Sequence, residues 1–250
     1  MTLLLIALLF AAGFFSGAIN AVAGGGTFIS FGALTLIGVP PIAANATSSI
    51  AQLPGYLTST LAYLKDIRTF WRGALLLAAV SVVGSLGGAL FLLYLDNQEF
   101  AALVPWLLLA ATALFAAGPW LAPSRNRAPD APRSRFAGPI VQFFTSIYGG
   151  FFGAGMGIMM LATLGLTESG DYHRLNALKN LLANVIAIIA IIVFVSGGVV
   201  YWAGALAMIP GVALGGYSGV WIARRVPQIV VRSFVVAVGL FLAGYYFVIG

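Results

Sequence analysis

Long apolar segments alternate along the whole chain with short polar or glycine-rich connections. A membrane helix needs roughly 20 predominantly apolar residues to cross the hydrocarbon core. The segments that meet this length, and that we expect to span a membrane, are residues 42–64, 73–95, 101–121, 175–195, 201–222 and 229–249. The pattern therefore predicts an all-α polytopic membrane protein.

Two further apolar stretches, residues 3–37 and 137–166, are each interrupted by glycines. The interruptions are Ala23-Gly-Gly-Gly-Thr27 and Gly153-Ala-Gly-Met-Gly157. A helix over residues 24–37 would measure only about 21 Å, which is short of a hydrocarbon core of roughly 30 Å. We therefore expect each stretch to form a broken helix or re-entrant hairpin that bends within the membrane.

The second half of the chain repeats the first at a constant offset of 131 residues, the separation between Asn45 and Asn176. The same offset places Trp71-x-Gly-Ala on Trp202-x-Gly-Ala. We therefore predict two repeats, each made of one broken helix and three spanning helices. The predicted boundaries are residues 1–122 for the N-terminal repeat, 123–135 for a cytoplasmic linker and 136–250 for the C-terminal repeat.

Lysine and arginine gather in alternate connections between the apolar segments, and by the positive-inside rule these connections face the cytoplasm. The basic connections include residues 65–72, 125–135, 174 and 224–225, whereas residues 39–44, 96–99 and 196–200 contain no Lys or Arg. The turn before Asn45 then faces outward and the turn before Asn176 faces inward, so the repeats are predicted to have inverted topology. Both termini are expected on the periplasmic side of the inner membrane.

Composition agrees with membrane embedding, because 61% of the residues are hydrophobic and only 7% are charged. Soluble domains carry about 25% charged residues. The net charge of +6 follows from the basic cytoplasmic connections, so we expect contact with the lipid bilayer and no nucleic-acid partner. The N-terminal segment has no basic region or cleavage site and is expected to remain as a membrane segment.

The chain contains no cysteine and a single histidine. This composition excludes disulfides, thiolate metal sites and a multi-histidine metal centre, and we expect neither a metal nor a cofactor. An intramembrane enzyme would need a nucleophile–base pair, a metal cluster or paired acids. Since no His or acid lies inside the apolar segments, we expect no catalytic residues.

Three asparagines recur at i, i+4 and i+8 and would form one polar stripe on a helix. Asn176, Asn180 and Asn184 could hydrogen-bond between packed helices, or they could face a binding site. Lys179 lies beside them inside an apolar run, where a charge is costly and usually functional. The cation therefore favours a site.

The first repeat carries a matching polar stripe, with a hydroxyl in place of the cation. Its members are Asn45, Ser49, Gln52 and Tyr56, and Ser48 beside it is equivalent to Lys179. One repeat then supplies a positive charge and the other supplies neutral hydroxyl and amide groups. This set would suit a small anion with several oxygen atoms, because an ammonium and neutral donors can replace its hydration shell.

The glycine-rich bends would supply backbone groups to the same site. Without a Cβ the chain can approach a ligand closely, and a helix that starts at a bend directs N–H groups and partial positive charge inward. The candidate backbone ligands are Gly24, Gly25, Gly26, Thr27, Gly153, Gly155, Met156 and Gly157. Alternatively, glycines only allow close helix packing, the interpretation favoured for Gly84, Gly88, Gly215 and Gly219.

The six acidic residues all lie in predicted connections or at helix ends. With no acid inside the membrane to bind cations, a cation pump is not expected. Sodium or proton coupling stays open, because neutral oxygens can bind sodium and an anion can carry a proton. Glu168, Asp171, His173 and Arg174 lie at the predicted inner mouth, where they would form either a gating ion-pair cluster or a solvated turn.

Several short motifs occur in a particular order along nearly the whole chain. They are Gly13-Phe-Phe-Ser-Gly17, Ala23-Gly-Gly-Gly-Thr-Phe28, Gly38-Val-Pro-Pro41, Ala46-Thr-Ser48, Gly150-Phe-Phe-Gly-Ala-Gly155 and Ala177-Leu-Lys-Asn180. Together they resemble the sulfite exporter TauE/SafE family of membrane transporters. The resemblance implies export of sulfite or small organosulfonates across the inner membrane.

We therefore expect a transporter that exports a small sulfur oxyanion or organosulfonate, such as sulfite or sulfoacetate. It would work by alternating access, with its site at the midplane between the repeats. A transporter or channel for another small anion is the alternative, and the inverted polar stripes argue against a non-transporting subunit. The sequence makes no prediction of oligomeric state.

Overall fold

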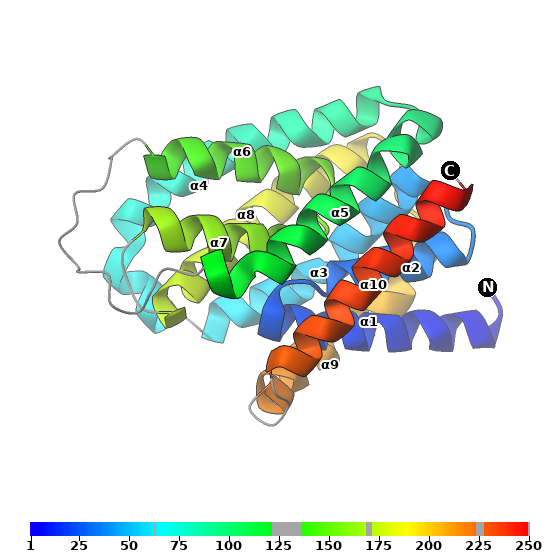
Figure 1. The fold of residues 1–250 in the computed structure, drawn as a ribbon, viewed down its shortest axis with the longest axis horizontal. Coiled ribbons are helices and arrows are strands. Elements are labelled where there is room, and N and C mark those ends of the chain that lie inside the picture. The colour runs from blue at the N-terminus through cyan, green and yellow to red at the C-terminus, as the bar shows by residue number, and fades with distance from the viewer. Residues whose placement is uncertain (63, 122–136, 169–171, 224–227, 250) are drawn as a thin grey trace.

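The computed structural model describes residues 1–62, 64–121, 137–168, 172–223 and 228–249. Within these ranges the ordered elements are all helices, which confirms the predicted all-α class (Figure 1). They are α1 (Leu3–Ala23), α2 (Thr27–Leu36), α3 (Pro41–Ala62), α4 (Leu64–Tyr94), α5 (Asn97–Leu121), α6 (Ala137–Phe151), α7 (Met156–Thr167), α8 (Tyr172–Ser196), α9 (Trp202–Ala223) and α10 (Gln228–Ile249). The predicted linker at residues 123–135 lies outside the described ranges.

The largest departure from the predicted helix bounds is at the start of α4. The sequence predicts a polar connection at residues 65–72, but α4 already begins at Leu64 and continues through this basic stretch. Lys, Arg and Leu are good helix formers, and neither Gly nor Pro occurs between Leu64 and Gly73. The helix is instead kinked at Phe70, where φ is −130°.

Both glycine-rich bends break the helix, as predicted, and both produce antiparallel hairpins. In the first hairpin Gly24 ends α1 with φ of 78°, and Ser16 Oγ of α1 donates to the Gly26 carbonyl oxygen at 2.6 Å. In the second, Gly153 and Gly155 have φ of 69° and 77°. These left-handed conformations favour glycine, so the residue type determines where each hairpin turns.

The tips of the two hairpins touch one another through glycine backbones. A Cβ atom added to Gly157 would lie 3.2 Å from Gly24 Cα, and a Cβ added to Gly24 would lie 3.0 Å from the Gly157 carbonyl carbon. The turn of one hairpin therefore contacts the turn of the other. A side chain at Gly24 or Gly157 would push the two turns apart.

Each hairpin also packs on a long helix from the other half of the chain. α1 lies along α9 and α6 lies along α4, while α3 packs on α8 and α5 packs on α10. Gly215 and Gly219 contact the backbone of α1, and Gly84 and Gly88 contact the backbone of α6. These glycines therefore act as helix-packing positions, as expected for small residues in membrane helices.

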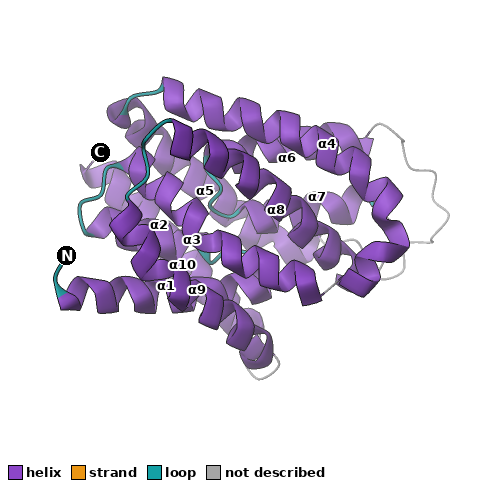
Figure 2. Cartoon of the chain, turned by 180° about the vertical axis from the view of Figure 1, so that it is seen from behind, coloured by secondary structure: helices purple, strands orange, loops and turns teal. Residues whose placement is uncertain are grey.

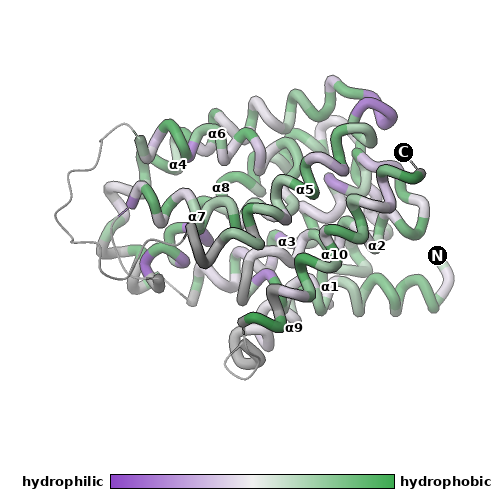
Figure 3. Tube along the Cα trace, viewed as in Figure 1, coloured by the Kyte–Doolittle hydropathy of each residue, from purple (hydrophilic) through white to green (hydrophobic). Residues whose placement is uncertain are grey.

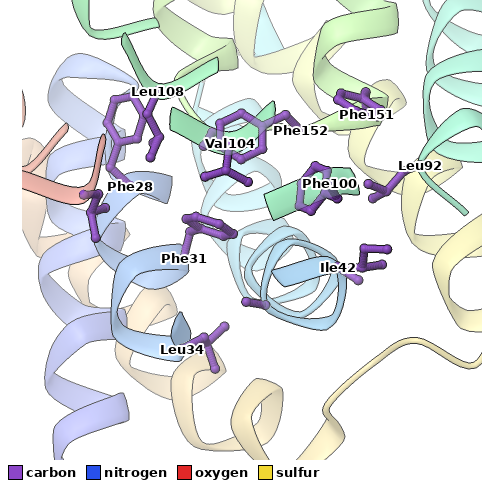
Figure 4. Packing of buried hydrophobic residues seen from close by; sticks show 14 of the residues in the cluster. Phe28, Phe31, Leu34, Ile42, Leu92, Phe100, Val104, Leu108, Phe151 and Phe152 are labelled. Atoms are coloured by element: carbon purple, nitrogen blue, oxygen red, sulfur yellow. The ribbon is translucent and has the colours of Figure 1, made fainter. Parts of the chain in front are cut away.

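An aromatic cluster fixes the hairpins against α5. Phe31 of α2 meets Phe152, which follows α6, with ring centroids 5.4 Å apart. Phe100 of α5 meets both Phe151 and Phe152 edge-on (Figure 4). Edge-to-face pairs of this kind add to the burial of the rings, so the two breaks are held from one side by a rigid hydrophobic core.

Hydrophobic residues dominate most of the helices (Figure 3), and many large hydrophobic side chains are exposed. Three stretches in the described residues are long and apolar enough to cross a membrane, namely Leu3–Ala21, Gly73–Tyr94 and Arg174–Ser196. The two termini lie at the same end of the molecule in both views (Figures 1 and 2). The fold is therefore that of a membrane-embedded, multi-pass helical protein.

Candidate functional site

A small internal cavity lies where the two hairpin tips meet the crossing of α3 and α8. Its volume is about 10 Å³, roughly the space that one water molecule needs. It is lined by Thr27, Ser49, Gln52, Tyr56, Gly149, Gly153, Met156, Ala187 and Ala190. In this conformation the cavity therefore has no room for a ligand larger than about one water molecule.

The orientation of the Gln52 amide follows from its hydrogen bonds. Ser16 Oγ gives its proton to the Gly26 carbonyl at 2.6 Å, and Ser30 Oγ gives its proton to the Thr27 carbonyl at 3.1 Å. Both hydroxyls can then only accept, and Gln52 Nε2 donates to each of them. Gln52 Oε1 must point the other way, and it has no hydrogen-bond partner among the described residues.

Two further buried polar side chains lie beside the Tyr56 hydroxyl, which interacts with both Thr27 and Asn20. Apart from Tyr56, Thr27 Oγ1 and Asn20 Oδ1 have no hydrogen-bond partner in the described part of the chain. Thr27 is 2% exposed and Asn20 is 6% exposed. Buried polar groups without a partner are rare in folded proteins and call for an explanation.

The helices α2 and α7 both begin at the cavity, with Thr27 and Met156 among its lining residues. Their N-terminal ends carry partial positive charge. Several of their first N–H groups are already bonded within the glycine turns, because Phe28 donates to Gly25 and Met156 donates to Gly153. In this conformation the bends therefore contribute mainly their dipoles.

Other members of the predicted polar stripes join helices in this conformation. Asn45 Nδ2 donates to the Phe151 carbonyl at 2.9 Å and so links α3 to the end of α6. Asn184 Nδ2 donates to the Tyr56 carbonyl at 3.0 Å and to Thr60 Oγ1, which links α8 to α3. Ser48 Oγ donates to the Asn45 carbonyl of its own helix.

Lys179 is buried within the protein, with only 2% of its surface exposed, but it does not line the cavity. It precedes Ala187 by eight residues, or about 12 Å along α8. Asn176 and Asn180 are also buried, and helical periodicity places them on the same face of α8 as Ala187. The cation therefore lies between the cavity and the N-terminal end of α8.

The structure thus brings only part of the predicted site together. Of the predicted ligands, the cavity wall contains Thr27, Ser49, Gln52, Gly153 and Met156. The predicted ligands outside the wall are Asn45, Ser48, Asn176, Lys179, Asn180, Asn184, Gly24, Gly25, Gly26, Gly155 and Gly157.

Sequence reasoning missed Gly149, Ala187 and Ala190 as wall residues and the serines that orient Gln52. A signal for the alanines was present, since they continue the asparagine face of α8 at helical spacing.

A second, wider cavity of about 760 Å³ opens at the N-terminal end of α3. Its walls are the start of α1 and three connections, at residues 37–43, 93–97 and 198–201. Among these lining residues Asp96 is the one charged side chain. The start of α1, which lines this cavity, lies at the end of the molecule that carries both termini (Figure 1).

The structure describes only part of the predicted gating cluster. Glu168 directly follows α7, and the exposed Arg174 near the start of α8 has its guanidinium carbon 5.2 Å from the centre of the Phe70 ring. Asp171 and the side chain of His173 lie outside the description. Arg174 therefore contacts α4 from α8, near the N-terminal ends of both helices.

Broken helices that meet inside a helical membrane protein are a feature of a class of polytopic proteins whose known members include secondary transporters. The chain belongs to the sulfite exporter TauE/SafE family, whose profile matches residues 9–246. This match confirms the family resemblance seen in the sequence motifs.

Curated relatives point to membrane transport. The chain is 29% identical over 239 residues to a "Probable membrane transporter protein" of Haemophilus influenzae, covering 93% of this chain and 90% of the relative. It is 27% identical over 237 residues to "Probable membrane transporter protein YfcA" of Escherichia coli K12, covering 94% and 87%. No solved structure matches the chain.

Proposed function

We propose that the protein exports a small sulfur oxyanion or organosulfonate, such as sulfite or sulfoacetate, by alternating access. The observation that carries this proposal is the meeting of two broken hairpins at one small cavity, whose lining includes Thr27, Ser49 and Gln52. Binding sites of secondary transporters form at such interrupted helices. The family description, sulfite exporter, supports the substrate class.

We further propose that residues 1–122 and 136–250 form inverted-topology repeats. At the offset of 131 residues the first residue of α3, Pro41, is equivalent to Tyr172 of α8, and Asn97 of α5 is equivalent to Gln228 of α10. The same offset relates α1 to α6 and α4 to α9. The packing of α1 on α9 is therefore equivalent to the packing of α6 on α4. A pseudo-two-fold arrangement gives two equivalent ways of opening the central cavity, one toward each side.

The cavity is too small for an oxyanion in the conformation described, since about 10 Å³ holds roughly one water molecule. The proposed cycle therefore requires the hairpin tips to separate toward one side at a time. Lys179 would attract the anion from the cytoplasmic side, because a buried ammonium is a strong partner for oxyanions. An inside-negative potential then favours export by about 2.3 kcal/mol per charge per 100 mV.

Purified protein reconstituted in proteoliposomes should transport radiolabelled sulfite, and unlabelled sulfite or sulfoacetate should compete with the label. Liposomes without protein supply the background rate. Transport of a carboxylate with no competition by sulfite or sulfoacetate would contradict the sulfur-anion proposal and favour another small anion.

The inverted topology predicts that equivalent connections face opposite sides of the membrane. Because the chain has no cysteine, a single introduced cysteine is the one thiol of this protein that can be labelled. Pro40→Cys and Asp171→Cys are separated by the repeat offset, and we expect a membrane-impermeant maleimide added to intact cells to label only Pro40→Cys. Labelling of both positions from outside would contradict the proposed topology.

A further inference from the structure

The buried apolar residues that the structure describes form two separate clusters, and the central cavity lies at the boundary between them. α8 contributes to one cluster from residues 175–187 and to the other from residues 190–194. Ala187 and Ala190, which face each other across this boundary in the sequence, both line the cavity. We call the first cluster, made of Tyr56 with buried residues of α4, α7 and α8, the inner cluster. It closes the cavity toward the N-terminal end of α8.

Tyr56 is the residue of the inner cluster that contacts the first hairpin. Its side chain is 4% exposed and lines the cavity. Its hydroxyl interacts with Thr27, at the start of α2, and with Asn20 of α1. Apart from Tyr56, Thr27 Oγ1 and Asn20 Oδ1 have no hydrogen-bond partner among the described residues. One hydroxyl of α3 therefore holds both arms of the first hairpin.

The position of Tyr56 along the molecule follows from its contact with α8. Asn184 Nδ2 donates to the Tyr56 carbonyl at 3.0 Å and to Thr60 Oγ1. Asn184 follows Lys179 by five residues and precedes Ala187 by three, or about 7.5 Å and 4.5 Å along the helix. Tyr56 is thus bonded to α8 at a level between the buried cation and the cavity.

We propose that Tyr56 is the inner gate of the protein, whose ring closes the cavity toward the cytoplasmic side and whose hydroxyl holds the first hairpin in the closed position. Inward opening then requires this hydroxyl to leave Thr27 and Asn20, so that the hairpin turn can move away from α3. This role rests on the proposed transport function, but the side to which the gate opens can be tested without any substrate.

The groups at the gate explain how an arriving anion would open it. The Tyr56 and Thr27 hydroxyls and the Asn20 amide are all hydrogen-bond donors, and the oxygens of an oxyanion can only accept. An anion that passes Lys179 would therefore replace the contacts that these side chains make with one another. A ligand that binds the open state better than the closed state shifts the population toward the open state.

The gate predicts that removal of the Tyr56 hydroxyl exposes the cavity from one side only. Because the chain has no cysteine, Ser49→Cys introduces one thiol in the cavity wall. It would be modified with 2-sulfonatoethyl methanethiosulfonate, which is small and membrane-impermeant, from outside in intact cells and from the cytoplasmic side in inverted vesicles. Adding Tyr56→Phe should raise the cytoplasmic rate about tenfold, which corresponds to about 1.4 kcal/mol in the opening equilibrium, and leave the outside rate unchanged.

Tyr148→Phe is the matched control. The Tyr148 hydroxyl donates to the Ala154 carbonyl at 2.6 Å, so this variant also loses a tyrosine hydrogen bond at a hairpin turn. Tyr148 packs on the other cluster and does not line the cavity, and its bond joins residues of a single hairpin. Tyr148→Phe should therefore leave the cytoplasmic rate unchanged. Thr27→Val removes the partner of the Tyr56 hydroxyl at nearly constant volume and should reproduce the effect of Tyr56→Phe.

An unchanged cytoplasmic rate in Tyr56→Phe would overturn the proposal, and so would a rate that rises equally from both sides, because a loosened fold has no preferred side. If Tyr56→Phe does not fold, Thr27→Val decides by the same two criteria. Sulfite flux is measured separately in proteoliposomes. A one-sided labelling response without sulfite flux would leave the gate standing and remove the sulfite proposal, whereas flux without the labelling response would overturn the gate alone.

Discussion

Replacing Lys179 by methionine should abolish sulfite transport and anion-induced stabilisation while leaving the protein folded. The Lys179 side chain is 2% exposed. It lies on α8 between the cavity and the N-terminal end of the helix, which we propose to be cytoplasmic. A charge inside a membrane helix costs about 3 kcal/mol. Such a cost is rarely retained without a function, and methionine fills a similar volume without the charge.

The expected loss is at least about 100-fold in sulfite flux, corresponding to the loss of a charge-assisted interaction of about 3 kcal/mol. The melting temperature without anion should stay the same or rise, because the buried charge is gone. Leu182→Met is the matched control, since Leu182 is fully buried on the same helix and a Leu to Met exchange costs less than about 1.5 kcal/mol. Normal sulfite flux in Lys179→Met would show that the cation is structural.

Helical periodicity explains which site residues were predictable from the sequence. Ser49 and Gln52 lie one turn apart on α3, so their shared face follows from spacing alone, and the structure shows that this face lines the cavity. The glycine bends were predictable for a similar local reason, because glycines cluster there and the segments that follow are too short to span a membrane. The positive φ angles of Gly24 and Gly155 confirm the bends.

The orientation of a side chain at the site was not predictable, because it depends on residues distant in the sequence. Gln52 is turned by Ser16 of α1 and Ser30 of α2, and each serine is committed to a backbone carbonyl. Lys179 shows the same difficulty. Spacing places it beside the asparagine stripe, but only the packing of α8 against its neighbours decides that it lies outside the cavity wall.

Of the substitutions proposed, Gly26→Ala should have the largest effect on stability. An added Cβ would collide with the Ser16 carbonyl oxygen and would lie 2.8 Å from Asn20 Cβ. The backbone of Gly26 is ordinary αR, so the effect of Gly26→Ala is steric and not conformational. Overpacking against backbone cannot be relieved by a rotamer change, and we expect destabilisation of about 3 kcal/mol, with α2 displaced from α1 and the cavity opened.

Gly87→Ala supplies the control for this substitution. It makes the same change inside α4, where nothing lies within 4 Å of the added Cβ, and alanine in an exposed helix position is neutral or stabilising by up to about 1 kcal/mol. Thermal melting in detergent should therefore separate the two variants by many degrees, and only Gly26→Ala should lose sulfite flux. Equal melting temperatures would mean that the first hairpin tolerates a wider bend, and that close contact between α1 and α2 is not what shapes the central cavity.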